Sequence, residues 1–252
     1  MLTNVWDAAS AALFAAAGSK ATATTSAGLA WACGYSDGDA LPQASLLSAV
    51  GAIRAVVPDL PLSVDLEGGY SDDPDEVANL VAQLQALGVA GINLEDGTGT
   101  PERLVAKIAA VKQRVNRQGG DVFVNARTDV FLRELASGED AVREAIARAA
   151  RYAGAGADGI FVPDLQERDA IARVAVAVER PLNLLAVPGL PSASELYQLG
   201  VRRVSAGSSL AKLAYGTARD AAQAFLRDGN SSVLFSDRSA GYGETNALLR
   251  GS

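Results

Sequence analysis

The feature that most constrains the fold is an alternation of short apolar or β-branched runs with longer amphipathic runs, repeated eight times along the chain. The short runs have the length of strands, and the longer runs space their apolar residues as helices do. This alternation predicts parallel strands joined by crossover helices. The expected strands are residues 2–6, 20–26, 61–66, 91–95, 122–127, 159–162, 182–187 and 201–205.

Helices are expected between these strands, and several begin with proline, which suits the first helical position because its missing N–H would be unpaired there. Eight strand–helix units predict one α/β domain over residues 1–252, a (β/α)₈ barrel of the TIM type. A doubly wound open sheet is the alternative, although no G-x-G-x-x-G motif follows the first strand. The expected helices are residues 8–17, 42–56, 74–87, 101–115, 139–153, 165–178, 192–199 and 208–226, with a short one near 244–249.

Composition excludes several classes of function. The formal net charge of −7 makes nucleic acid and anionic membranes unfavourable partners. No apolar run is long enough to span a bilayer and no secretory leader follows Met1, so a cytoplasmic location is expected. The chain has no histidine and one cysteine, Cys33, which excludes a Ser-His-Asp triad, a His-ligated zinc site and an intrachain disulfide. Its four lysines lie before strands or within helical patterns, so a Schiff-base lysine is not expected.

Two acids stand at the end of the third expected strand. Asp65 and Glu67 are two residues apart, so a strand would aim both side chains to the same side. Converging carboxylates repel each other unless a cation, a proton or water lies between them, and oxygen ligands suit Mg²⁺. The alternative is two solvated acids beside the Gly68-Gly69 turn.

Polar residues also follow the other strands at the same end. In a (β/α)₈ barrel this end carries the active site. Glu95 and Asp96 could continue the carboxylate cluster or instead form a helix N-cap pair. Arg127 could be a structural partner of the acids or a guanidinium fork for a substrate carboxylate. The further strand-end residues are Asn4, Asp7, Thr25, Ser26, Asn93, Glu95, Asn125, Asp129 and Asp164.

Two small-residue segments could bind an anion through their backbone amides. Thr25-Ser26-Ala27-Gly28 follows the second strand, where converging N–H groups act as a helix N-terminus does. Residues 205–209 follow the eighth strand, where barrels often bind phosphate, although this run also reads as a serine-capped helix start.

Taken together, the motifs resemble the isocitrate lyase and phosphoenolpyruvate mutase superfamily, especially small bacterial members related to 2-methylisocitrate lyase. The matching stretches are collinear from Asn4 to Asp164: NVWDAASA, TTSAGLA, GYSDGD, VDLEGGY, GINLED, VNARTDVF and GADGIFVPD. The resemblance implies a barrel whose last helix is exchanged between subunits of a homodimer or homotetramer, with the helical tail of about residues 208–252 in the subunit contacts. Members of the superfamily often have a helix ahead of the first strand that this sequence does not show, so the natural start could lie upstream.

The resemblance assigns roles to particular residues. It implies Mg²⁺, or alternatively Mn²⁺, held by Asp65, Glu67 and Glu95. It implies catalytic roles for Asp37 and Arg127. The residues implied to bind substrate are Thr25, Ser26, Ala27, Gly28, Asp65 and Arg127.

One departure bears on the reaction. The carbon–carbon lyases of this superfamily carry a Lys-Lys-Cys-Gly-His gating segment, whereas only residues 97–100 separate Asp96 from Pro101 here. The function expected is a Mg²⁺-dependent lyase that cleaves a C–C bond in a small 2-oxo or 2-hydroxy dicarboxylate such as oxaloacetate, through a pyruvate-type enolate. The alternatives are a phosphonopyruvate hydrolase or mutase acting on a P–C bond, a catalytically silent protein that binds a 2-oxo acid such as 2-oxoglutarate, and a phosphosugar barrel.

Overall fold

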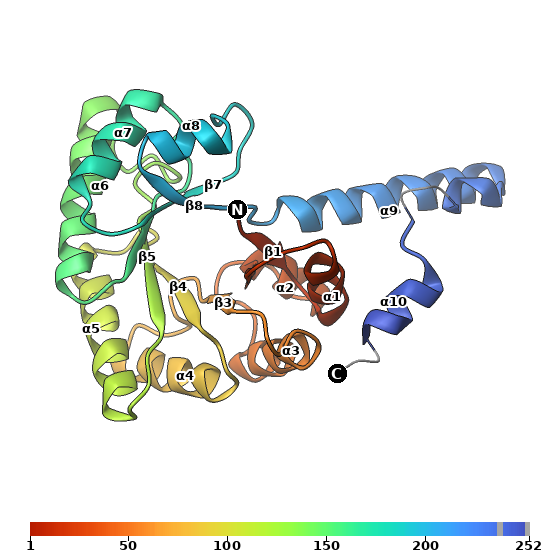
Figure 1. The fold of residues 1–252 in the computed structure, drawn as a ribbon, viewed down its shortest axis with the longest axis horizontal. Coiled ribbons are helices and arrows are strands. Elements are labelled where there is room, and N and C mark those ends of the chain that lie inside the picture. Colours follow the sequence, from red (N-terminus) through yellow and green to blue (C-terminus); the bar gives the residue numbers. More distant parts are fainter. Residues whose placement is uncertain (236–238, 250–252) are drawn as a thin grey trace.

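A computed structural model describes residues 1–235 and 239–249 and confirms the predicted (β/α)₈ barrel (Figure 1). Eight parallel strands follow one another in sequence order around one sheet. The backbone amide of Leu2 donates to the Val204 carbonyl at 2.8 Å, which joins the first strand to the last. The strands are β1 (Thr3–Val5), β2 (Thr22–Thr24), β3 (Leu62–Asp65), β4 (Gly91–Glu95), β5 (Phe123–Arg127), β6 (Gly159–Phe161), β7 (Leu182–Leu185) and β8 (Val201–Ser205).

Helices alternate with the strands as the sequence predicts, and proline stands in the first helical positions at Pro74 and Pro101. The segment after β2 differs from expectation. The strand was expected to reach Ser26, but it ends at Thr24, and a short helix begins at Ser26. The helices are α1 (Ala8–Ala16), α2 (Ser26–Ala32), α3 (Gln43–Val56), α4 (Pro74–Ala86), α5 (Pro101–Arg117), α6 (Gly138–Gly154), α7 (Arg168–Ala177), α8 (Ala193–Gln198), α9 (Ser209–Asp228) and α10 (Tyr242–Leu249), with a 3₁₀ turn, η1 (Ser231–Leu234).

The hydrophobic core lies between the outer face of the barrel and the surrounding helices. Strand residues such as Val64, Ile92 and Val124 are fully buried there against the apolar faces of the helices. Since side chains alternate along a strand, the intervening residues point into the barrel. Several of these are polar, including the buried Asn93 and Asn125, so the barrel interior is hydrogen-bonded as well as packed.

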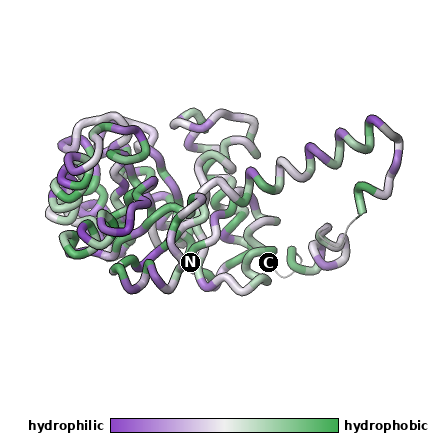
Figure 2. Tube along the Cα trace, turned by 90° about the horizontal axis from the view of Figure 1, so that it is seen from above, coloured by the Kyte–Doolittle hydropathy of each residue, from purple (hydrophilic) through white to green (hydrophobic). Residues whose placement is uncertain are grey.

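Helix α9 leaves the barrel and projects into solvent, and α10 returns to contact α1 (Figure 1). Hydrophilic and hydrophobic residues alternate along α9 (Figure 2). Leu213 and Leu226 on this helix are 67% and 81% exposed. Among the helices that the structure describes, none has the length and hydropathy needed to cross a bilayer.

The packing of α4 supports a stability prediction. Leu84 is fully buried in the core, whereas Leu87, which caps the same helix, is 37% exposed. We expect Leu84→Ala to lower the free energy of unfolding by about 2–5 kcal/mol, because it removes buried methyl groups and leaves a cavity. Leu87→Ala should cost about 1 kcal/mol or less. Urea unfolding followed by circular dichroism measures both, and equal costs would contradict the described packing.

Candidate active site

A small cavity of about 230 Å³ opens at the carboxyl ends of the strands. Polar residues from several strand ends line it, at the end of the barrel where the sequence predicts the site, together with the first turn of α2. The possible phosphate-binding run of residues 205–209 lines the same cavity through Ser205, Gly207 and Ser208. Among the predicted site residues, Thr25, Ser26, Ala27, Asp37, Asp65 and Arg127 line it.

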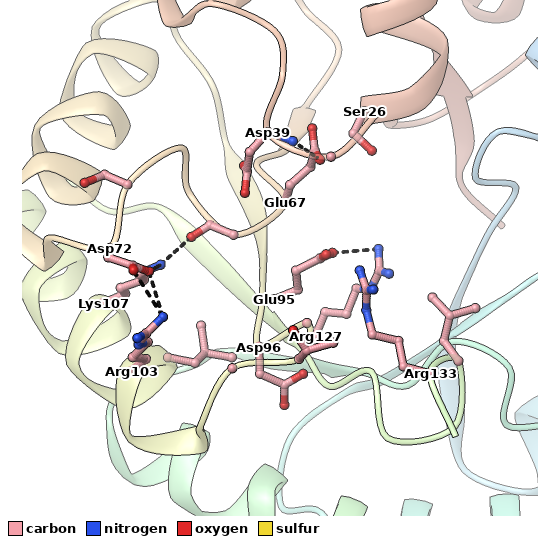
Figure 3. Close-up of a pocket in the computed structure, with 18 of the residues that line it drawn as sticks. Ser26, Asp39, Glu67, Asp72, Glu95, Asp96, Arg103, Lys107, Arg127 and Arg133 are labelled. Atoms are coloured by element: carbon pink, nitrogen blue, oxygen red, sulfur yellow. Dashed lines mark hydrogen bonds and ion pairs between the residues drawn. The ribbon is translucent and has the colours of Figure 1, made fainter. Parts of the chain in front are cut away.

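A larger cavity of about 630 Å³ adjoins the first and shares Ser26, Asp37 and Arg127 with it (Figure 3). Glu67 and Glu95 line this outer cavity, so all three predicted metal ligands face one or other of the two spaces. Gly28 is not among the residues lining either cavity. A Cβ at Gly28 would lie 3.0 Å from the Cβ of Trp6, so this glycine allows close packing of α2.

Asp65 is held by hydrogen bonds from three directions. Its backbone amide donates to the Thr24 hydroxyl at 2.9 Å, and its carboxylate faces the Ser26 amide and the Asn93 side-chain amide at 3.4 Å each. Burial raises the pKa of Asp65, against the lowering effect of the Arg127 guanidinium. Burial therefore disfavours the charged form of Asp65, whereas Arg127 and the hydrogen bonds from Ser26 and Asn93 favour it.

The orientation of Asn93 is fixed by side chains from two other strands, β5 and β8. The Asn93 side-chain oxygen accepts from the Asn125 amide at 2.8 Å and from the Arg203 guanidinium at 2.9 Å. Because two donors hold this oxygen, the Asn93 nitrogen must face Asp65. Arg203 on β8 thus helps to orient Asn93 on β4, which in turn contacts Asp65 on β3. Burial lowers the pKa of Arg203 to about 10.

Glu67 is buried in a left-handed backbone conformation with φ 49°. Its carboxylate accepts from the Asp39 amide at 2.6 Å, and the Tyr70 hydroxyl lies 3.4 Å away (Figure 3). The Asp39 carboxylate accepts from the Tyr70 amide at 3.2 Å. These contacts fasten the loop that carries Asp37 to the end of β3. Burial, together with the charges of Asp37, Asp39 and Asp65, raises the pKa of Glu67 to about 7.

Arg127 is clamped between two acids. Its Nη1 lies 2.8 Å from Glu95, and its Nε and Nη2 donate to Asp129 at 2.6 and 3.1 Å. Arg133 donates to the same fully buried Asp129 at 2.9 Å. Three of the five N–H donors of Arg127 are engaged by these acids, which fixes the plane of the guanidinium at the mouth of the barrel.

The acids of the pocket outnumber the cations that face them. Burial raises the pKa of Glu95 to about 8 although Arg127 opposes the shift, and the charges of Asp129, Asp65 and Glu67 add to it. A hard divalent cation would relieve this repulsion. Within residues 1–235 and 239–249, no three acidic, histidine or cysteine side chains gather tightly enough to enclose a bare ion. Mg²⁺ retains several waters and needs only one or two direct carboxylates, so the donor set fits a hydrated ion.

Asp96 has a structural role, and its interpretation as a helix N-cap is wrong. Thr100 occupies the N-cap position of α5. The Asp96 carboxylate accepts from the Asp129 amide at 2.9 Å, from Arg148 at 2.9 Å and from the Tyr152 hydroxyl at 2.5 Å. It thereby ties α6 to the loop that positions Arg127.

Asp7 and Asp164, two further strand-end acids, do not line either cavity, whereas Asp96 lines the outer one. Asp7 caps α1 by accepting from the Ser10 amide at 2.7 Å. Asp164 accepts from the side-chain amide of Gln166 at 2.7 Å. Both residues therefore have local roles in their own loops.

Several pocket residues were not expected from the sequence. Lys107 lies in a helix, α5, as expected, but no role at the pocket was predicted for it, and its Nζ donates to the Gly68 carbonyl at 2.7 Å. The sequence contains a pattern that could have indicated this burial, because Lys107 lies at helical spacing with the buried Leu104 and Ile108. No such periodicity marks Asp39, whose place depends on how its loop folds back.

The contacts of Asp96 support a second stability prediction. We expect Asp96→Asn to lower the free energy of unfolding by about 3 kcal/mol, because it leaves the largely buried Arg148 without its buried carboxylate. Asp72→Asn, which breaks an exposed ion pair with Arg103, should cost less than about 1 kcal/mol. Chemical denaturation of the two variants measures the difference. A loss of less than about 1 kcal/mol for Asp96→Asn would contradict the structural role.

The fold and the pocket define a (β/α)₈-barrel protein with an acid-lined site at the carboxyl ends of its strands. Residues 1–226 match the model of the phosphoenolpyruvate phosphomutase family, and the chain belongs to that family. This confirms the superfamily that the sequence motifs indicate, whose members include lyases and mutases.

Three relatives illustrate the range of the family. An uncharacterized protein of Mycobacterium tuberculosis is 39% identical over 254 residues, which cover 99% of this chain and 91% of the relative. An oxaloacetate decarboxylase of Bradyrhizobium sp. is 31% identical over 154 residues, which cover 58% of this chain and 51% of the relative. The crystal structure of a 2,3-dimethylmalate lyase superposes with a TM-score of 0.86 at 26% identity, over 99% of this chain and 89% of the lyase.

Proposed function

We propose that the protein is a Mg²⁺-dependent lyase that cleaves a C–C bond in a small 2-oxo or 2-hydroxy dicarboxylate, with oxaloacetate as the first substrate to test. The observation that carries this proposal is the convergence of Asp65, Glu67 and Glu95 on adjoining cavities that Arg127 also lines. The similarity to an oxaloacetate decarboxylase supports the choice of substrate.

Asp65, Glu67 and Glu95 would hold the ion, in part through its waters, and Mn²⁺ could replace Mg²⁺ because both prefer oxygen ligands. When bound, the cation supplies a Lewis acid for the negative charge that develops on the keto oxygen. The raised pKa values of all three carboxylates support a site for positive charge at this place.

The residues of the chain would bind and orient the acid around that charge. The free N–H donors of Arg127 suit a substrate carboxylate, since a guanidinium fork matches its geometry. The amides of Ser26 and Ala27, in the first turn of α2, would add positive potential beside Asp65. Asp37 lines both cavities, where its carboxylate could position water or transfer a proton to the carbon released by cleavage.

One observation favours a second candidate, a catalytically silent protein that binds a 2-oxo acid. The connection from β4 to α5 consists only of residues 96–100, and it leaves the outer cavity without a covering segment from this loop. Since exclusion of water assists lyase chemistry, an uncovered site could bind without turnover. Phosphonopyruvate, the P–C substrate, belongs in the same assays, in which released phosphate would identify a hydrolase.

The proposal predicts turnover that depends on metal. Purified protein with Mg²⁺ should convert oxaloacetate to pyruvate, and a chelator should abolish the reaction. Asp65→Asn should lower kcat/KM at least about 100-fold, because it weakens the carboxylate set that holds the ion. Asp164→Asn, a strand-end acid outside the residues that line the cavities, is the matched control and should leave kcat/KM unchanged. A pyruvate-coupled assay measures all three proteins.

The lyase proposal would be abandoned if neither oxaloacetate nor longer malate homologues turned over with Mg²⁺ or Mn²⁺. Tight binding of 2-oxoglutarate or oxalate without turnover would then support the silent binding protein. Phosphate released from phosphonopyruvate would support the P–C enzyme.

We also propose that α9 pairs with a second copy of the chain in a homodimer or homotetramer, with exchange of this helix between subunits. Its projection from the barrel supports this, because a helix with exposed apolar residues is stabilised by a partner surface (Figure 1). The resemblance to the superfamily supports it as well. The part of the tail at residues 236–238 and 250–252 lies outside the described residues.

Assembly can be tested on the exposed leucines of α9. The double variant Leu213→Glu/Leu226→Glu should be monomeric, because charges would be buried unpaired in the contact. Val176→Glu changes an apolar residue on α7 that is 86% exposed and should leave the assembly intact. Size-exclusion chromatography with light scattering measures the mass of each. A monomeric wild-type protein would contradict the proposal.

A further inference from the structure

The two adjoining cavities differ in size in a way that bears on the substrate. The inner cavity, at about 230 Å³, is smaller than the roughly 300–1,000 Å³ typical of pockets for drug-sized ligands, whereas the outer cavity, at about 630 Å³, falls within that range. The inner cavity suits the keto group and adjacent carboxylate of a small 2-oxo acid, which together form the head of the ligand. The outer cavity then provides room for a chain that extends from it.

Cations lie at two separate places around the outer cavity. Arg127 and Arg133 stand on one side, whereas Arg103 and Lys107 of α5 stand on the other (Figure 3). Glu67 and Glu95, the proposed metal ligands, line the same space between these two pairs of cations (Figure 3). A ligand with a negative charge at each end would therefore fit this distribution better than one with a single charge.

The two cations on α5, Arg103 and Lys107, already contact one carboxylate, that of Asp72. The Arg103 Nη1 lies 3.1 Å from both oxygens of Asp72, and the Lys107 Nζ lies 3.9 Å from the nearer one. The arginine and aspartate side chains are 60% and 74% exposed, and such solvated pairs contribute little to stability. A ligand carboxylate could therefore replace Asp72 at small cost.

Lys107 adds a positive charge whose hydrogen bonds are incompletely used. Its side chain is only 8% exposed, and its Nζ donates to the Gly68 carbonyl at 2.7 Å. An ammonium group has three donors, and a buried charge favours a nearby anion. The short link of residues 96–100 leaves this part of α5 at the cavity wall.

We propose that Arg103 and Lys107 form a second carboxylate subsite, which Asp72 occupies when no ligand is bound. On the basis of the proposed function, the preferred ligand is a 2-oxo dicarboxylate whose second carboxylate lies farther from the keto group than it does in oxaloacetate. The head of this ligand lies in the inner cavity and its distal carboxylate on α5.

Binding of unreactive acids in the presence of Mg²⁺ tests the subsite by isothermal titration calorimetry. Oxalate probes the head site alone, and 2-oxoglutarate and 2-oxoadipate carry distal carboxylates. Arg103→Met should weaken binding of the longer acids at least about tenfold, through loss of a charged hydrogen bond, and leave the Kd of oxalate unchanged. Asp72→Asn should tighten binding of the longer acids severalfold, because the competing carboxylate is removed.

Arg114→Met is the matched control, because it removes a charge from the exposed last turn of α5. It should leave all three Kd values unchanged. The subsite is refuted if Arg103→Met and Asp72→Asn affect oxalate and the longer acids equally, or affect neither. Oxalate binding with no advantage for the longer acids also refutes the subsite alone, whereas failure of oxalate to bind the wild-type protein with Mg²⁺ counts against the proposed function.

Discussion

The arrangement of the site depends on a single guanidinium, that of Arg127, held between Glu95 and Asp129. Asp129 is fully buried, and its backbone amide is in turn fixed by Asp96, which Arg148 and Tyr152 hold from α6. A continuous set of charged hydrogen bonds thus connects a surface helix to the mouth of the barrel. Because each member is largely buried and paired, the loss of one would leave another charge uncompensated.

The same mouth contains more negative charge than its own cations balance. Asp65, Glu67 and Glu95 all have raised pKa values, which means that their charged forms are unfavourable in the protein alone. A stable protein tolerates such a cluster when a ligand supplies the missing charge, and perturbed carboxylates are typical of functional sites. This relation between stability and function is the reason a divalent cation is central to the proposed reaction.

The two adjoining cavities have different roles in the proposed binding of substrate. The inner one is lined by strand ends and the first turn of α2 and would hold the proposed small acid, and the outer one extends from it to α5. The short link between β4 and α5 permits this connection, because a longer loop at that place would cover the outer space. Loop length at one strand end therefore bears on both substrate size and access of water.

The sequence by itself determined the barrel and most of the residues at its mouth. Strand and helix periodicities are local properties, and parallel strands of a barrel end at one face, so Asp65, Glu95 and Arg127 could be placed together without coordinates. Tertiary structure decided which partners these side chains contact and which of the side chains line the cavities. Asp96 turned toward Arg148 and Tyr152, Lys107 reached the Gly68 carbonyl, and Arg203 crossed the barrel to Asn93. These outcomes depend on distances between residues far apart in the chain, which no local pattern encodes.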